Sequence, residues 1–155
     1  MIINSKDIKG KITHLTNKEN FNSIINEGYK VGNRTGSFKP KGLWLSWEGG
    51  WEQWTKENNY RWKESTLKVE LDPDLKILLI DSLNDFKEVY INQFKGKDIK
   101  WGSDYKEFWG WLSNRVNGVA LTSKGERETK LNTFLYGWDC QCILLFKPLC
   151  QFTTR

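Results

Sequence analysis

The sequence predicts an α+β domain, with a split, mixed or antiparallel β-sheet core and short flanking helices. Segments with strand-like alternation and segments with helical spacing follow one another without a regular strand–helix–strand order, which is typical of the α+β class. The 155 residues are a normal length for one domain. No internal repeat or Pro/Gly-rich linker divides the chain, so we expect a single domain over residues 1–155.

Alternating or continuous apolar patterns predict the strands. In the third of them, Leu67, Val69 and Leu71 point to one side, and the turn sequence Asp72-Pro73-Asp74 follows. Pro148 limits the last strand. The predicted strands are residues 11–16, 42–47, 66–71, 75–80, 118–122 and 136–146.

Helical spacing predicts four helices. The first begins in Thr16-Asn17-Lys18-Glu19, which has the pattern of a capping box, and ends at Gly28 as a C-cap. Apolar residues at helical spacing predict the others over 51–60, 82–94 and 104–116. The polar segments 31–37 and 123–132 are expected to be loops.

Charge and cysteine content restrict the class of protein. The chain carries 24 Lys and Arg against 19 Asp and Glu, a net charge of +5 that favours a polyanionic partner or serves solubility alone. The three cysteines are too few and odd in number for a disulfide framework, and one histidine is too few for a usual zinc site, so we expect no metal. No signal peptide is visible and the apolar runs are too short for a membrane span, which predicts a cytoplasmic protein without a membrane partner.

The single histidine, His14, stands at the end of a predicted strand and directly before a helix N-terminus. Such N-termini attract anions such as phosphates. One histidine excludes mechanisms that need two, and the sequence lacks the nucleophile elbow, the dinucleotide fingerprint and the phosphate loop. His14 is therefore either a ligand-binding residue or a half-buried strand residue with a structural hydrogen bond.

Aromatic and basic residues cluster around the second predicted strand. Trp44 and Ser46 are two residues apart and share one strand face, where an indole and a hydroxyl suit a flat, polar ring. Lys39 and Lys41 precede them and are either phosphate ligands or solvated loop charges. The alternative for Trp44 is a place in the core.

Two further groups carry candidate functions. Trp51 and Trp54 are three residues apart on a predicted helix and either pack it on the sheet or wall a cleft. Asp139 and Gln141 would share one face of the last strand and hold sugar hydroxyls, or form a polar pair at the sheet edge.

Taken in order, these segments resemble the histidine-type ADP-ribosyltransferase fold family, the branch of the poly(ADP-ribose) polymerases and diphtheria toxin. The resemblance implies that NAD is the co-substrate. It implies that His14 and Thr16 bind NAD from the first strand, that Trp44 and Ser46 form the nicotinamide pocket, and that Trp54 adds to its wall. Leu15 and Trp44 depart from the commoner Gly and Tyr of the family.

The family carries a catalytic Glu on a late strand, and this sequence has none there. Gln141 aligns with it, with Asp139 as the alternative, so that Gln141, Asp139 and His14 are the expected catalytic residues. The resemblance also implies an acceptor surface, to which we assign Lys39, Lys41, Trp51 and Tyr136, beside a loop over 123–136.

The expected function is mono-ADP-ribosyl transfer from NAD to a macromolecule, with RNA or DNA slightly favoured over protein. A toxin or defence effector with an antitoxin or inhibitor would fit this activity. The alternatives are a non-enzymatic nucleic-acid-binding module that uses the same Trp and Lys residues, and an inactive NAD-binding family member that serves as a protein-binding subunit.

Overall fold

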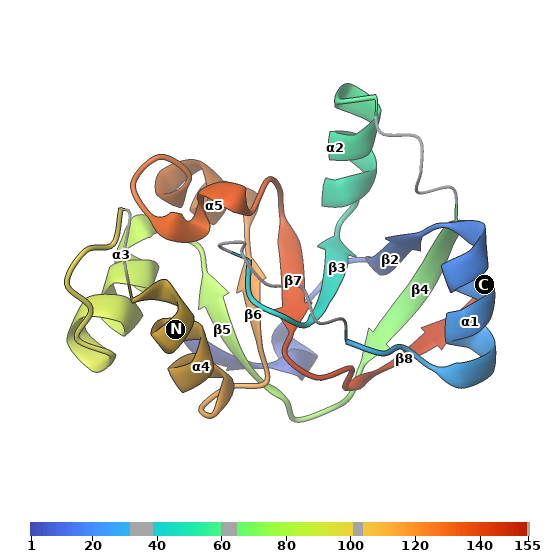
Figure 1. The fold of residues 1–155 in the computed structure, drawn as a ribbon, viewed down its shortest axis with the longest axis horizontal. Helices are drawn as coiled ribbons and strands as arrows, with labels where there is room; N and C mark the ends of the chain where they lie inside the picture. Colours follow the sequence, from blue (N-terminus) through green and yellow to red (C-terminus); the bar gives the residue numbers. More distant parts are fainter. Residues whose placement is uncertain (32–38, 60–64, 101–103, 155) are drawn as a thin grey trace.

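The computed structural model describes residues 1–31, 39–59, 65–100 and 104–154, and they form an α+β domain around one mixed sheet (Figure 1). Within these residues eight strands pair in the order β1-β5-β6-β7-β3-β2-β4-β8. β5 and β6 are parallel, and every other neighbouring pair is antiparallel. The α+β class and the mixed sheet that the sequence predicts are confirmed.

The strands are short, as their apolar runs suggested. Their bounds are β1(Ile2–Asn4), β2(Ile12–Thr16), β3(Leu43–Trp47), β4(Ser65–Leu71), β5(Lys76–Ile80), β6(Gly118–Leu121), β7(Cys142–Leu145) and β8(Cys150–Thr153). β1 and β8 form the two edges of the sheet, and the sequence analysis missed both because each has only three or four residues with little alternation.

The helices gather at the two ends of the sheet. α3, α4 and α5 lie beside β5 and β6, α1 lies beside β4 and β8, and α2 extends from β3 (Figure 1). Their bounds are α1(Lys18–Glu27), α2(Gly50–Glu57), α3(Leu83–Lys87), α4(Tyr105–Ser113) and α5(Ser123–Thr129), with a π-helical stretch η2(Glu88–Gln93) and 3₁₀ turns η1(Ser5–Asp7) and η3(Phe134–Gly137).

The helix that follows β2 begins one residue later than its sequence pattern predicts. Asn17, not Thr16, caps α1, and its side chain accepts a hydrogen bond from the Asn20 amide. Gly28 ends the helix as predicted, with φ at 82° and its amide bonded to the Ile24 carbonyl. Thr16 therefore remains in the strand, 5% exposed, at the entrance to the helix.

Two predictions about the C-terminal third are wrong. Residues 123–129 of the expected loop over 123–132 form a helix, because Thr122 caps α5 and Gly125 packs directly against the Ile80 carbonyl, where a Cβ would come within 2.2 Å. Residues 136–146 are not one long strand, because η3 occupies 134–137 and strand pairing begins only at Cys142. Asp139 and Gln141 thus precede the strand and do not share a strand face.

The core has a separate cluster on each side of the sheet. Aromatic side chains dominate the larger one, where Phe86, Tyr90, Phe108 and Phe134 have ring centroids 5.2–5.8 Å apart. The Tyr90 hydroxyl donates to Asp104, and burial together with this carboxylate raises the tyrosine pKa. This cluster holds the α3–α5 end of the sheet rigidly.

Thr122 joins the sheet to α5 through two hydrogen bonds. Its hydroxyl accepts from the Gly125 amide at 3.0 Å and donates to the Asp81 carboxylate at 2.6 Å. Thr122→Val removes both bonds at nearly constant volume, so we expect the free energy of unfolding to fall by about 1–2 kcal/mol. Urea unfolding measures this loss. Thr122→Ser keeps the hydroxyl and should stay near wild type; equal losses in both variants would contradict the capping role.

Candidate functional site

A cleft opens where β2 and β3 separate. The two strands pair only through Ile12–Trp47 and Thr13–Ser46, whereas β2 continues to Thr16 and β3 begins three residues earlier, at Leu43. Beyond the Thr13–Ser46 pair, the two backbones are no longer paired. The His14 ring bridges the strands instead, with its Nδ1 atom 3.0 Å from the Trp44 carbonyl oxygen. The side chain of the single histidine therefore lies between the strands rather than in the core.

The Trp44 carbonyl also decides the tautomer of the neutral imidazole. A carbonyl oxygen only accepts hydrogen bonds, so Nδ1 carries the hydrogen and donates it. In the neutral ring Nε2 is then the acceptor. The rings of Tyr29 and Phe152 contact the imidazole edge-on, with centroids 5.5 and 6.1 Å away, and the Tyr29 hydroxyl donates to the Gly42 carbonyl at 3.4 Å. These contacts hold His14 in one orientation.

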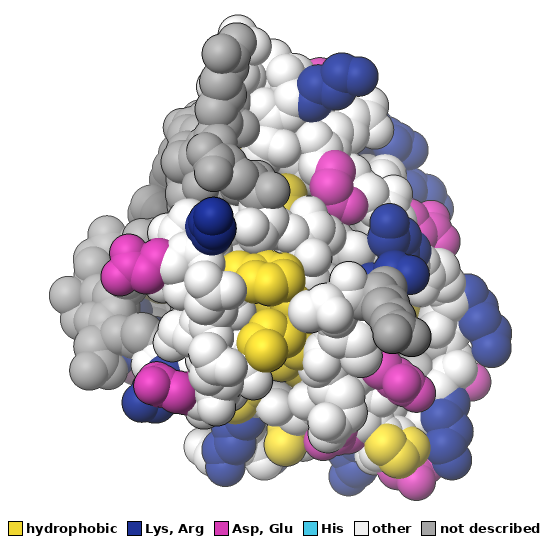
Figure 2. Space-filling view, turned by 90° about the vertical axis from the view of Figure 1, so that its right-hand side faces the viewer, with side chains coloured by type: hydrophobic (Ala, Val, Ile, Leu, Met, Phe, Trp, Pro, Cys, Tyr) yellow, Lys and Arg dark blue, Asp and Glu magenta, His cyan; other side chains and the backbone are white. Residues whose placement is uncertain are grey.

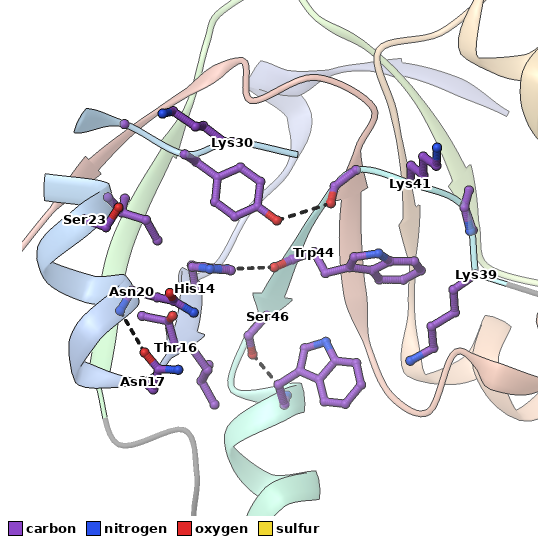
Figure 3. A pocket seen from close by; sticks show the side chains of 17 residues that line it. His14, Thr16, Asn17, Asn20, Ser23, Lys30, Lys39, Lys41, Trp44 and Ser46 are labelled. Atoms are coloured by element: carbon purple, nitrogen blue, oxygen red, sulfur yellow. Dashed lines mark hydrogen bonds between the residues drawn. The ribbon is translucent and has the colours of Figure 1, made fainter. Parts of the chain in front are cut away.

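The cleft is a cavity of about 610 Å³, a size usual for small-molecule sites (Figure 3). It runs from the first turns of α1, across the strands, to the start of α2. Among the residues that line it are His14, Thr16, Asn17, Asn20, Ser23, Tyr29, Lys30, Lys39, Lys41, Trp44, Ser46 and Trp51.

The polar lining favours an anionic ligand. Lys30, Lys39 and Lys41 line the cavity, and no described Asp or Glu does. The α1 N-terminus also faces it through Asn17 and Asn20 (Figure 3). Cations and a helix N-terminus together stabilise phosphate groups.

Lys39 lies between two tryptophans at the α2 end of the cleft. Its Nζ atom is 5.4 Å from the Trp44 ring centroid and 5.1 Å from that of Trp51, and it is 3.8 Å from an Asp139 carboxylate oxygen. Behind Trp44, the fully buried Trp138 makes an edge contact with centroids 4.6 Å apart. We call Trp44, Trp51, Lys39 and Asp139 the tryptophan–lysine cluster.

Two buried hydroxyls connect the cleft to α2. Ser46, 1% exposed, accepts a hydrogen bond from the Trp51 amide at 3.0 Å. Its cross-strand neighbour Thr13, also 1% exposed, donates to the Glu52 carboxylate at 3.1 Å. Glu52 is therefore held by the cross-strand neighbour of Ser46, although it is not itself among the described residues that line the cavity. The sequence analysis missed Thr13 and Glu52, although the adjacency of Glu52 to Trp51 was a signal.

The structure brings together seven of the residues that the sequence analysis selected. His14, Thr16, Lys39, Lys41, Trp44, Ser46 and Trp51 all line the cavity. Trp54 is not among the described lining residues; it contacts Trp51 edge-on at 5.3 Å. Tyr136 belongs to η3, but its side chain lies outside the described residues, as do residues 32–37 of the expected loop.

Gln141 and Asp139 lie beyond the cavity lining described for this cleft. The Gln141 Oε1 atom accepts from the amide and the hydroxyl of Ser123, and its Nε2 donates to Glu48 at 3.4 Å. The Gln141 backbone packs against Gly50, where a Cβ would come within 2.3 Å of the carbonyl oxygen. The segment before β7 thus supports the start of α2.

The cysteines have the properties of inert thiols. Burial raises the pKa of Cys140 to about 12, and the neighbouring Asp139 carboxylate adds to the increase. Cys142 is buried in the sheet, and burial raises its pKa as well. Among the described residues, no group of three or more His, Cys, Asp or Glu side chains is arranged to hold a metal ion.

A second cavity, of about 370 Å³, adjoins the first at the α1 end of the molecule. Ile24, Gly28 and Tyr29 line both cavities and so form the wall between them. Seen from this end, a small group of hydrophobic side chains lies among charged ones (Figure 2).

No helix in the described part of the chain has the length and apolar character needed to cross a membrane. Comparison of the chain with protein-family models, with curated proteins and with solved structures gave no significant match. The function is therefore argued from the cleft itself.

Proposed function

We propose that the protein binds NAD in the cleft between β2 and β3 and transfers its ADP-ribose to a macromolecular acceptor, with an ADP-ribosyltransferase-like fold. One observation carries the proposal: where the strands separate, His14, Thr16, Trp44 and Ser46 line a single cavity of about 610 Å³. These are the residues that the resemblance assigns to NAD, and they come from two segments about 30 residues apart in sequence.

Each lining group suits one part of the dinucleotide. Trp44 offers an indole to the nicotinamide ring, and the Ser46 hydroxyl has a hydrogen to donate to the carboxamide oxygen. His14 is held by the Trp44 carbonyl in an orientation suited to a ribose hydroxyl. Lys30, Lys41 and the α1 N-terminus supply positive potential for the pyrophosphate.

The reaction breaks the bond between the ribose C1′ and the nicotinamide nitrogen, and the bonding pair leaves with nicotinamide. Positive charge develops on the ribose, the acceptor nucleophile attacks C1′, and its proton passes to solvent. A carboxylate near the ribose lowers this barrier. Glu52 is our candidate, because it is bonded to Thr13, the cross-strand neighbour of the lining residue Ser46, whereas Asp139 is paired with Lys39 and Gln141 is an amide.

The acceptor that we favour is a nucleic acid. The sequence over 28–47 contains four basic and no acidic residues, and its described residues 28–30 and 39–42 line the cleft. Lys41 is exposed at the cleft, where it would meet an incoming strand. Basic side chains beside indoles bind single strands through phosphate contacts and base stacking.

Thermal unfolding with and without NAD tests the proposal. At about 100 times its Kd, NAD should stabilise the protein by about 2.7 kcal/mol, which raises Tm by about 5–10 °C. His14→Ala should abolish this shift. Lys68→Ala is the matched control, since Lys68 is exposed on the strand next to β2 and is not among the described lining residues.

Two results would contradict the proposal. The first is an absence of any NAD shift in wild-type protein while single-stranded RNA or DNA binds at low salt, which would favour the binding module instead. The second is an equal NAD shift in wild type and His14→Ala.

A further inference from the structure

The tryptophan–lysine cluster has the composition of a binding site for an organic cation. Two indole faces lie 5.4 and 5.1 Å from one ammonium nitrogen, and the Asp139 carboxylate lies 3.8 Å from it. Aromatic faces with a nearby carboxylate are the groups that recognise pyridinium and alkylammonium ions. In this structure the cation is supplied by the chain itself.

The walls of this site are fixed independently of Lys39. The Trp44 ring packs on the buried Trp138, which in turn stacks on Trp109 with centroids 5.4 Å apart and planes at 16°. The Trp51 amide is bonded to the buried Ser46 hydroxyl. The Trp51 ring also packs edge-on against Trp54, with centroids 5.3 Å apart, so both indoles have packing partners other than the lysine.

The ion pair of Lys39 with Asp139 is one of its contacts with the described residues, and it is long and partly exposed. The Lys39 side chain is 31% exposed, the distance to Asp139 is at the long end for an ion pair, and its methylenes lie near the Gly137 position, which has no side chain. A partly exposed ion pair contributes little to stability. Since Lys39, Trp44 and Trp51 all line the cavity, a ligand that enters the cleft reaches the ammonium directly.

We propose that Lys39 is an internal plug, and that a ligand with a delocalised positive charge takes its place between Trp44 and Trp51. Resting on the proposed function, this ligand group is the pyridinium ring of NAD. Lys39 then swings toward solvent, and Asp139 becomes the counter-ion of the incoming ring. The neutral ring of reduced NAD gains no cation–π attraction there and does not displace the lysine.

The test uses 1-methylnicotinamide, a pyridinium cation without sugar or phosphate, and neutral nicotinamide as its comparison. Indole N–H signals of ¹⁵N-labelled protein report binding, with the Trp44 and Trp51 signals assigned from Trp44→Phe and Trp51→Phe. Lys39→Met keeps the methylene chain and removes the charge. It should tighten 1-methylnicotinamide binding by about 3- to 10-fold and leave nicotinamide binding unchanged.

Two matched variants complete the design. Lys39→Arg keeps a permanent charge and should retain the weak wild-type affinity for the cation. Lys68→Met removes an exposed charge on β4 that is not among the described cavity-lining residues, and it should change neither affinity. Unshifted Trp109 and Trp138 signals verify that each variant remains folded.

Tighter binding of the cation alone in Lys39→Met supports the plug. An unchanged or weaker affinity, an equal gain for neutral nicotinamide, or a similar gain in Lys68→Met overturns it. The result of this test does not depend on whether the proposed function is correct. A protein that never cleaves NAD can still show the selective gain, and an active transferase without that gain retains its function and loses the plug.

Discussion

Glu52→Gln is expected to lower the rate of NAD cleavage by about 10²–10³-fold and to leave NAD binding nearly unchanged. The Thr13 hydroxyl bonds the Glu52 carboxylate, and Thr13 is the cross-strand neighbour of Ser46, which lines the end of the cavity assigned to nicotinamide. The glutamine variant keeps the size and hydrogen bond of the side chain and loses the negative charge that opposes the developing cation. Nicotinamide release, followed by chromatography, measures the rate, and quenching of tryptophan fluorescence measures binding.

Two nearby residues provide the controls for this variant. Glu48→Gln removes an exposed carboxylate that is bonded to Gln141 and should leave the rate close to wild type. Gln141→Glu restores the acidic residue of the family pattern, but it would place a carboxylate against Glu48, so no gain in rate is expected. A large gain in Gln141→Glu, or wild-type cleavage by Glu52→Gln, would transfer the catalytic role away from Glu52.

Trp138→Ala is expected to lower the free energy of unfolding by about 3–5 kcal/mol, the largest stability effect that we expect in this molecule. Its side chain is 0% exposed and lies between the Trp44 edge and the parallel Trp109 ring. Removing it leaves a cavity under the Trp44 wall of the cleft. Urea unfolding measures the loss, and NAD binding should weaken as Trp44 loses its support.

Two further variants test whether the loss of stability comes from the buried position of Trp138. The Trp138 Nε1 atom has no hydrogen-bond partner among the described residues. Trp138→Phe therefore removes packing volume but no hydrogen bond of the indole, and it should lower the free energy of unfolding by less than Trp138→Ala does. Trp54→Ala removes a half-buried indole and should cost much less. Losses of similar size in Trp54→Ala and Trp138→Ala would contradict this account of the core.

Most of the fold depends on local patterns that can be recognised in a sequence. Helix ends at Gly28, apolar spacing over 104–116 and the turn at Asp72-Pro73-Asp74 depend on neighbouring residues and are found where expected. The predictions failed where a distant contact overrides a local pattern. Residues 123–129 carry mostly polar side chains, and packing of Gly125 against the Ile80 carbonyl stabilises their helix.

The candidate site also has some features that follow from local sequence and others that follow from tertiary contacts. Sequence alone determined that His14, Trp44 and Ser46 lie on strands, because strand periodicity is a local property. Only the tertiary structure decided that the strands separate after Thr13 and Ser46, that Lys39 lies between two indoles, and that Glu52 is bonded to Thr13 whereas Gln141 is bonded to Ser123 and Glu48. These facts depend on strand register and on packing between residues far apart in the chain, and no local pattern encodes either.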